Sequence, residues 1–277
     1  MSSRTPAPVS CGAMADLLAL APHRSTTATL LAGAARERGM DVSVLPRDGL
    51  RAGPPPGTRA HYYGGPLFAD SALGGLGIAL LEPAGSWLDG LPYAFTGRRV
   101  GCVPLSEARR ASGPLFVKPP TDKSFPAAVY ADGARLRLPG SPLEDPLVQV
   151  SEVVTWVREF RLHLLDGEIR TGSQYAVHGR LDVAPLTGHG DEAAVRAFAA
   201  RLVEGHGGSL PSGVVLDVGL MRGSDDAGEG RWAVVEANMA WFSNVYAGDP
   251  ARALDVVLRA AGPRADIGEG DARFRRA

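Results

Sequence analysis

Three side chains with oxygen donors interrupt two apolar segments in the last third of the sequence. Asp217 lies within residues 214–220, and Glu236 and Asn238 lie within residues 231–238. Both segments are typical of β-strands, and two residues separate Glu236 from Asn238, so these two would share one face. A carboxylate without a partner is costly in an apolar strand, and a compensating group is therefore expected. The alternative is an edge strand whose polar residues face water.

The spacing of these residues predicts that they converge. The polar loop 221–230 separates the two segments, so antiparallel pairing would bring Asp217 roughly opposite Val234, one step along the face from Glu236. Carboxylate and amide oxygens suit a hard divalent cation that completes its shell with water and phosphate. We therefore expect a metal site formed by Asp217, Glu236 and Asn238.

Two lysines stand out among the basic residues. The chain has 29 basic residues, of which Lys118 and Lys123 are lysines and the other 27 are arginines. Arginine does not replace lysine where a compact ammonium must reach a phosphate, although two lysines could also remain close together by chance. Lys118 ends the apolar strand predicted over 114–118, and Lys123 lies in the next loop.

A third basic residue lies on a predicted strand over 159–165. Strict alternation places Glu159, Arg161 and His163 on one face, and the other face is apolar. Arg161 would face a cleft, whereas His163 either lines that cleft or is a buried structural histidine. Together with the metal ligands, these cations would neutralise phosphate oxygens and complete a nucleotide site.

The composition excludes several classes of protein. The chain has 277 residues and a formal charge of −1, which excludes a nucleic-acid-binding protein that acts through net positive charge. It has no apolar run of about 18 residues that could span a bilayer, and residues 1–9 lack a secretion-signal pattern. We expect a globular, cytoplasmic protein that binds neither nucleic acid nor membrane, with Cys11 and Cys102 as plain buried thiols.

The elements that must position these residues fall into three units. The first opens with a strand, a helix and a strand, the pattern of a parallel sheet, and ends near Pro104. The second contains a short helix, the strand that ends in Lys118, a hairpin turning at Asp132-Gly133 and a further strand. The third contains the strands described above, and its Arg-rich tail after Gly262 is expected to be loose. The remaining predicted elements are strands 15–20, 41–45 and 146–150, and helices from Ser25 or Thr26 to Gly39, 106–111, 191–204 and 250–261.

The ordered set of motifs resembles the ATP-grasp superfamily, in particular its clade named for two arginines and a lysine. The resemblance extends from Tyr62 to Asp249. It implies an α/β to α+β protein in which two α+β subdomains grip ATP after a Rossmann-like N-terminal domain. The implied domains are 1–104, 105–154 with the hinge, 155–262 with the metal site, and a flexible tail at 263–277. The motifs are residues 116–119, 150–154, 159–161, 216–219 and 235–238.

The resemblance also implies a role for each matching residue. Lys118 would reach the adenine and α-phosphate side of ATP, and Arg161 would hold the γ-phosphate and the acyl-phosphate. Lys123 would be a second catalytic cation. The other cofactor-binding residues would be Val150, Ser151, Glu152 and Val153 of the hinge together with Glu159, and the ligands of two Mg²⁺ ions would be Asp217, Glu236 and Asn238, with Glu236 bridging.

The implied reaction is an ADP-forming ligation of a carboxylate to an amine or another nucleophile through an acyl-phosphate. Its cofactors would be ATP and Mg²⁺, and its substrates small molecules or peptides. One alternative is a small-molecule kinase on the same scaffold. Another is a nucleotide-binding module without turnover; the complete metal set argues against it, whereas the absence of glycine from residues 121–126 leaves it open.

Overall fold

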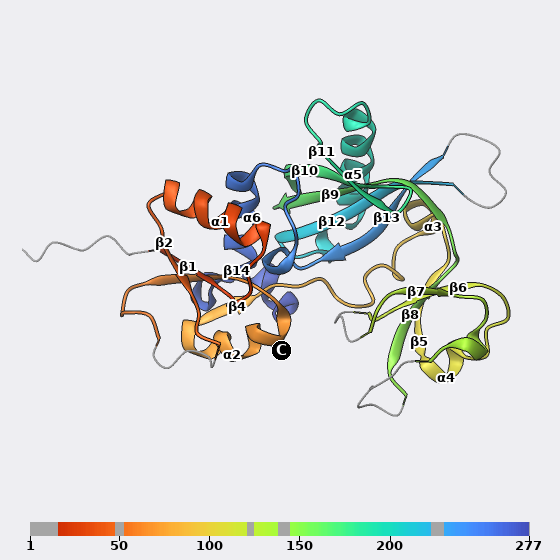
Figure 1. Ribbon diagram of the computed structural model, residues 1–277, viewed down its shortest axis with the longest axis horizontal. Helices are drawn as coiled ribbons and strands as arrows, with labels where there is room; N and C mark the ends of the chain where they lie inside the picture. Colours follow the sequence, from red (N-terminus) through yellow and green to blue (C-terminus); the bar gives the residue numbers. More distant parts are fainter. Residues whose placement is uncertain (1–15, 48–52, 121–124, 138–144, 223–229, 277) are drawn as a thin grey trace, which may run out of the picture.

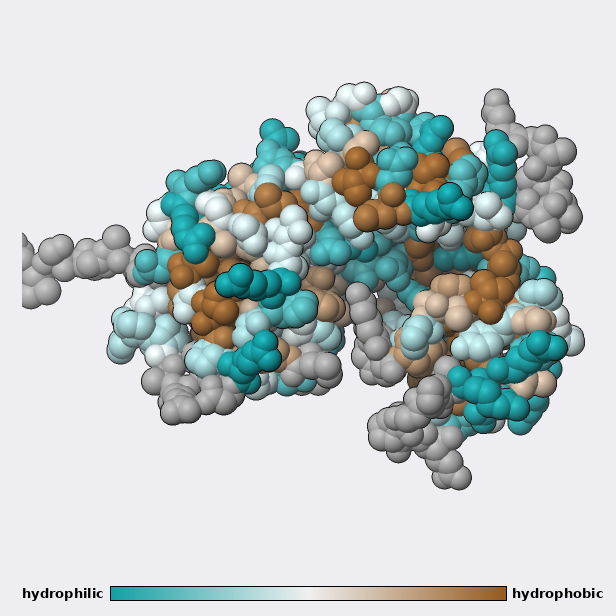
Figure 2. All heavy atoms as spheres, in the orientation of Figure 1, coloured by the Kyte–Doolittle hydropathy of each residue, from teal (hydrophilic) through white to brown (hydrophobic). Residues whose placement is uncertain are grey.

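The structure is a computed structural model that describes residues 16–47, 53–120, 125–137, 145–222 and 230–276. These residues form three lobes around a central hollow (Figure 1, Figure 2). We call them the N-terminal lobe, the small lobe and the large lobe. No helix among the described residues is long and apolar enough to cross a membrane. Lys123 and Cys11 lie outside the described residues.

The N-terminal lobe contains the expected parallel sheet, in the order β2-β1-β3. Helix α1 begins after Ser25, whose side chain accepts a hydrogen bond from the backbone N–H of Ala28, 3.0 Å away. Buried alanines and leucines of α1 pack against the sheet and against α6 of the large lobe. The elements are β1 (Asp16–Leu20), α1 (Thr26–Glu37), β2 (Asp41–Val44), β3 (Arg59–Tyr63), α2 (Pro66–Leu76) and β4 (Ile78–Leu80).

The C-terminal segment completes this lobe, which differs from the loose tail expected at 263–277. Strand β14 pairs with β4, and Phe274 is buried. Arg276 Nε lies 2.8 Å from Asp70 Oδ1, and its Nη1 lies 3.1 Å from Glu82 Oε2. These partners are far away in the sequence, so local patterns do not reveal them. The segment comprises β14 (Ala261–Pro263) and the 3₁₀ helices η4 (Arg264–Asp266) and η5 (Glu269–Phe274).

The small lobe is an antiparallel sheet in the order β5-β8-β6-β7. Strand β5, which we expected in the first unit, pairs with β8 from Val100 opposite Ser151 to Pro104 opposite Leu147. The expected boundary at Pro104 therefore lies after a strand that belongs to this sheet. The elements are β5 (Val100–Pro104), α4 (Leu105–Ala108), β6 (Leu115–Lys118), β7 (Ala128–Tyr130), η1 (Gly133–Arg135) and β8 (Leu147–Ser151).

The hairpin predicted at Asp132-Gly133 was wrong. Asp132 instead caps the 3₁₀ helix η1, because its side chain accepts a hydrogen bond from the backbone N–H of Arg135 at 3.1 Å. Gly133 is required by a close contact, since a Cβ there would lie 2.3 Å from the carbonyl oxygen of Ala108. Strand β7 pairs with β6.

The large lobe is a five-stranded antiparallel sheet in the order β11-β10-β9-β12-β13. Helix α5 covers one face, where Phe160, Leu162 and Leu164 of β9 form the core predicted by their alternation. Helix α6 and the N-terminal lobe cover part of the other face. The elements are α3 (Tyr93–Thr96), β9 (Thr155–Leu165), β10 (Glu168–Val177), β11 (Arg180–Pro185), α5 (Glu192–His206), η2 (Gly207–Ser209), β12 (Gly213–Arg222), β13 (Arg231–Asn238), η3 (Ala240–Phe242) and α6 (Pro250–Ala260).

Candidate active site between the small and large lobes

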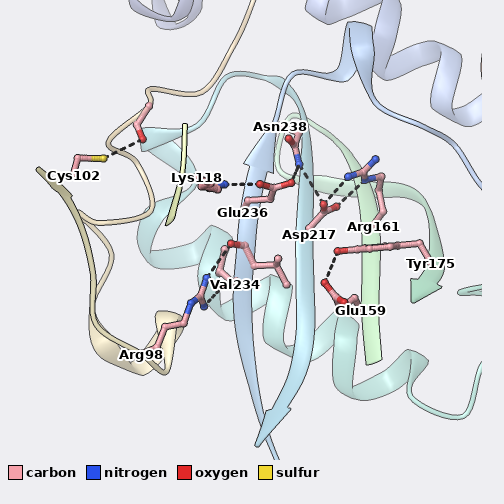
Figure 3. A network of polar contacts seen from close by, with 12 residues as sticks. Arg98, Cys102, Lys118, Glu159, Arg161, Tyr175, Asp217, Val234, Glu236 and Asn238 are labelled. Atoms are coloured by element: carbon pink, nitrogen blue, oxygen red, sulfur yellow. Dashed lines mark hydrogen bonds and ion pairs between the residues drawn. The ribbon is translucent and has the colours of Figure 1, made fainter. Parts of the chain in front are cut away.

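The end of β6 in the small lobe meets β13 of the large lobe (Figure 3). Lys118 Nζ lies 2.5 Å from Glu236 Oε2. On the other side of Glu236, the amide nitrogen Nδ2 of Asn238 donates to Glu236 Oε1 at 2.9 Å and to Asp217 Oδ2 at 3.2 Å. The three expected metal ligands and Lys118 therefore form one cluster.

Arg161 joins the cluster from the neighbouring strand. It lies directly opposite Asp217 in the pairing of β9 with β12. Its Nε donates to Asp217 Oδ1 at 2.8 Å, and its Nη2 donates to Oδ2 at 2.7 Å. This is the two-point contact of a planar guanidinium with a carboxylate, and only 1% of the Asp217 side chain is exposed. Asp217 thus has the compensating cation that its apolar strand requires.

A β-bulge determines which residues face this site. The expected pairing of Asp217 with Val234 was wrong: Asp217 lies opposite Glu236, and Val218 lies opposite Val234. Val235 is the extra residue of β13, with no partner on β12. Because side chains alternate along a strand, the uninterrupted register would put Glu236 on the core face opposite Leu216. The bulge instead directs Glu236 toward Asp217.

The charges in the cluster perturb one another. Burial alone would raise the pKa of Glu236, but Lys118, with help from Asn238, holds it down at about 2. Burial also disfavours the charge on Arg161, yet Asp217 outweighs this effect and raises the pKa of Arg161. Both acids are therefore ionised and matched by cations near neutral pH.

Aromatic side chains surround Arg161. The rings of Tyr175 and Tyr246 stack, with centroids 5.4 Å apart, and the Arg161 Cζ lies 5.4 Å from the centroid of each. The Tyr175 hydroxyl donates to Glu159 Oε2 at 2.8 Å. Burial raises the pKa of Glu159, and this hydrogen bond opposes the rise. Tyr246 has a backbone φ of +53°, a conformation that is unfavourable for a bulky residue and concentrates at functional sites.

A cavity of about 410 Å³ lies between the cluster and the hinge. Lys118 and Glu236 line one end of it, and Glu159 lies on its wall. Val150 is not among its lining residues, because its side chain packs against the core of the small lobe. The hinge residues that line the cavity are Ser151, Glu152, Val153 and Val154.

Glu152 connects the two chain crossings between the lobes. Its Oε1 accepts from Arg99 Nε at 2.8 Å, and its Oε2 accepts from the Arg99 backbone N–H, also at 2.8 Å. In return the Glu152 N–H donates to the Arg99 carbonyl at 3.2 Å. The backbone N–H of Arg99, the largest effect, and its guanidinium lower the pKa of Glu152. This carboxylate therefore has a structural partner at the cavity wall.

A second cavity, of about 430 Å³, lies on the other side of Lys118. It shares Lys118, Gln149 and Glu236 with the first cavity. The remainder of its wall is largely apolar and includes Trp87, Leu88, Phe125 and Met239. The Lys118–Glu236 ion pair thus lies at the boundary between two spaces of similar size.

Two other residues considered from the sequence lie apart from the cluster. His163 is buried, and neither ring nitrogen has a hydrogen-bond partner among the described residues; burial, reinforced by Arg161, lowers its pKa to about 3. It is therefore a neutral structural histidine. Arg170 donates to Asp255 of α6 at 3.0 Å. Cys102 is partly buried, and burial raises the pKa of its thiol, which disfavours nucleophilic chemistry.

Sequence reasoning missed Arg98 and Gln149, which line the first cavity. Gln149 lies opposite Lys118 in the pairing of β6 with β8, and the alternation of β8 could have placed it on the same face as Ser151. Arg98 precedes β5 in a segment without periodicity, so no sequence signal distinguished it from a surface arginine.

The donor set of the cluster fits magnesium. Asn238 lies within hydrogen-bond distance of both carboxylates, so all three side chains are close enough to share an ion. Oxygen donors with places left for phosphate and water are typical of Mg²⁺ sites. No group of three His, Cys, Asp or Glu residues with metal-site geometry occurs in the described part of the chain, so the amide is needed to complete the set.

Comparison with known proteins agrees with this arrangement. The model of an ATP-grasp domain family, the second family of the clade named for two arginines and a lysine, matches residues 95–256, more than half of the chain. The chain belongs to this ATP-grasp family. The resemblance seen in the sequence is thereby confirmed. No curated protein matches the chain significantly.

Solved structures extend the ATP-grasp likeness to the whole chain. A RimK domain protein of the ATP-grasp type from Sphaerobacter thermophilus shares 20% identity with a TM-score of 0.57, over 88% of this chain and 97% of that one. D-alanine–D-alanine ligase from Bacillus anthracis, complexed with ATP, shares 12% identity with a TM-score of 0.48, over 90% and 96% of the two chains. The first likeness shows the fold, and it confirms the α/β to α+β prediction with its N-terminal parallel sheet.

Proposed function

We propose that this ATP-grasp protein is an ADP-forming ligase that activates a carboxylate as an acyl-phosphate and transfers the acyl group to an amine. The observation that carries the proposal is the convergence of Lys118, Arg161, Asp217, Glu236 and Asn238 at the end of the cavity that the hinge lines. A triphosphate needs cations along its length and acids that hold a metal, and this cluster supplies both.

The nucleotide would lie in the first cavity. Backbone groups of residues 151–153 are available to the adenine edge, with Glu159 on the wall of the same cavity. Lys118 would exchange its contact with Glu236 for the phosphates, and Arg161 would exchange Asp217 for the transferred phosphoryl group. Each exchange replaces one anion by another, so neither cation is left buried and unpaired.

Asp217, Glu236 and Asn238 would hold the magnesium ions. When bound, magnesium neutralises charge on the phosphate oxygens. Departure of Lys118 and Arg161 frees oxygens of both carboxylates for this role. Lys123, outside the described residues, belongs to the proposal as a further cation at the phosphates.

The reaction balances in two steps. A carboxylate oxygen forms a bond to the γ-phosphorus while the bond to the β,γ-bridging oxygen breaks, and ADP leaves with that electron pair. The amine nitrogen then attacks the acyl carbon, inorganic phosphate leaves, and the amine loses a proton. Arg161 lowers the repulsion between the anionic carboxylate and the γ-phosphate, and the cluster aligns them. No protein nucleophile is required.

The second cavity is the proposed substrate site. It lies beside Glu236 and Asn238, so a molecule inside it would be next to the phosphoryl group that these residues help to hold. Its largely apolar wall favours a substrate with an apolar portion next to the reacting group.

The experiment combines binding with product analysis. ATP with Mg²⁺ should raise the melting temperature of the protein, and pooled carboxylates and amines should then produce ADP and free phosphate. Glu236→Gln should abolish the Mg²⁺-dependent part of the stabilisation, and Glu204→Gln on the exposed surface of α5 should leave it intact. A stable phosphorylated product without free phosphate would identify a kinase, and unchanged binding in Glu236→Gln would overturn the proposed metal site.

A further inference from the structure

Arg98 is a buried cation without an ion-pair partner among the described residues. Only 6% of it is exposed, and the ion pairs of the described chain do not include it. Its Nη1 donates to the carbonyl oxygens of Thr96 at 3.0 Å and Val234 at 2.8 Å, and its Nη2 donates to that of Val235 at 3.1 Å. Its partners are therefore backbone carbonyls, two of them on β13 (Figure 3).

These two carbonyls belong to the β-bulge. In a regular strand, successive carbonyls point toward opposite edges, so one guanidinium does not reach two of them in a row. At the bulge, Val235 has no partner on β12 and the backbone of β13 is irregular. The planar fork of Arg98 binds the Val234 and Val235 carbonyls together, and a single ammonium could not reproduce that geometry.

The surroundings of Arg98 are shaped to admit it. Helix α3 ends at Gly97, whose φ is +61°, and a Cβ there would lie 3.0 Å from Met221 Sδ. On its other side, the Arg98 Cζ lies 5.0 Å from the centroid of the Trp156 ring. Trp156 in turn lies over Gly219, where a Cβ would come within 2.5 Å of the ring. Two glycines thus make room for the guanidinium and for the ring that it covers.

We propose that Arg98 is a positioning residue that holds the β13 bulge and so keeps Glu236 facing Asp217. The bulge leaves carbonyls without ladder partners, and unpaired buried carbonyls are costly. Arg98 satisfies two of them only in the bulged register. In the regular register Glu236 would face the core. The consequence for metal binding rests on the proposed function, whereas the effect on the strand does not.

The first experiment measures the strand alone. Arg98→Lys and Arg98→Met are compared with Arg99→Lys, the matched change at the neighbouring exposed arginine, by amide hydrogen exchange of peptides covering residues 231–238. We expect roughly tenfold faster exchange in both Arg98 variants and no change in Arg99→Lys. Unchanged exchange in folded Arg98→Lys, or an equal increase in Arg99→Lys, would overturn the proposal. Arg98→Lys is the conservative variant if Arg98→Met does not fold.

The second experiment measures the effect on Glu236. Calorimetric titration of ADP at a series of Mg²⁺ concentrations gives the half-saturating Mg²⁺ concentration and, with a chelator, the metal-free affinity. For Arg98→Lys we expect the former to rise roughly tenfold, with the latter within about twofold of wild type. A rise confined to the metal-free dissociation constant would contradict a positioning role. If wild-type binding does not depend on Mg²⁺, the proposed function fails, and the exchange experiment still decides the role of Arg98.

Discussion

Lys118 lies at the contact between lobes and touches Glu236, and it is one of two lysines in a chain with 27 arginines. The retention of lysine at this position is consistent with a compact ammonium that must fit between a buried carboxylate and a second anion. A guanidinium keeps the charge but is wider and planar, and both cavities beside Lys118 would lose space to it.

We therefore predict that Lys118→Arg weakens ATP binding roughly tenfold although the charge is conserved. Isothermal titration with ATP and Mg²⁺ checks this, with Arg180→Lys on the exposed edge strand β11 as the control. An affinity equal to that of wild type would remove the argument from lysine retention.

His163 gives a prediction for pH dependence. Its pKa falls from an ordinary value of 6.5 to about 3 in the folded protein, chiefly through burial. Between these values the unfolded chain binds a proton that the folded chain does not, so the free energy of unfolding decreases as pH falls from about 6.5 toward 3. His163→Leu should make this decrease shallower. It should also raise the free energy of unfolding at pH 8 by about 1–3 kcal/mol, because two ring nitrogens without partners leave the core.

Denaturant titrations of His163→Leu at several pH values check both effects. His23→Leu is the control at an exposed position. An acid slope identical to that of wild type would show that other groups carry the pH dependence.

At the scale of elements, the site depends on regular alternation in β9 and on an irregularity in β13. Alternation predicted the faces of Arg161 and Phe160 correctly, because a two-residue period is a local property of the sequence. The facing of Glu236 toward Asp217 was predicted only approximately, because nothing in two consecutive valines marks Val235 as an extra residue. Register is decided by contacts with other elements, including the carbonyl contacts of Arg98, and these are not local.

Gly219 tests the packing that supports β12 and β13. Gly219→Ala would place a Cβ 2.5 Å from the Trp156 ring and force the ring toward the nucleotide cavity that it lines. We expect a loss of about 1–3 kcal/mol in the free energy of unfolding and weaker ATP binding. Gly208→Ala is the matched control, since a Cβ there would meet nothing within 4 Å. Equal stability of the two variants in thermal and denaturant unfolding would contradict this account.

At the scale of the whole molecule, the order of the three lobes was predictable and their limits were not. Strand–helix–strand patterning identified the N-terminal sheet, and the order of motifs identified the ATP-grasp subdomains. The assignment of β5 to the small lobe and of the C-terminal segment to the N-terminal lobe depends on partners β8 and β4 that are distant in the sequence. A short strand does not encode its distant partner in its own composition.

Phe274 tests whether the C-terminal segment is part of the folded molecule. It is 8% exposed, so Phe274→Ala should reduce the free energy of unfolding by about 2–4 kcal/mol. Arg264→Ala, at an exposed position nearby, should change it by no more than about 0.5 kcal/mol. Chemical denaturation of both variants provides the measurement, and a Phe274→Ala variant as stable as wild type would return the segment to the status of a loose tail.

The pairing of β4 with β14 has a consequence for how the protein is made. The ribosome completes β4 early, whereas β14 emerges only after both ATP-gripping lobes have been synthesised. Domains generally fold as units during synthesis, with the N-terminal unit first, but here the first lobe lacks a strand until the chain is almost finished. The large and small lobes can acquire their structure before then. The N-terminal lobe is therefore expected to start folding first and to finish last.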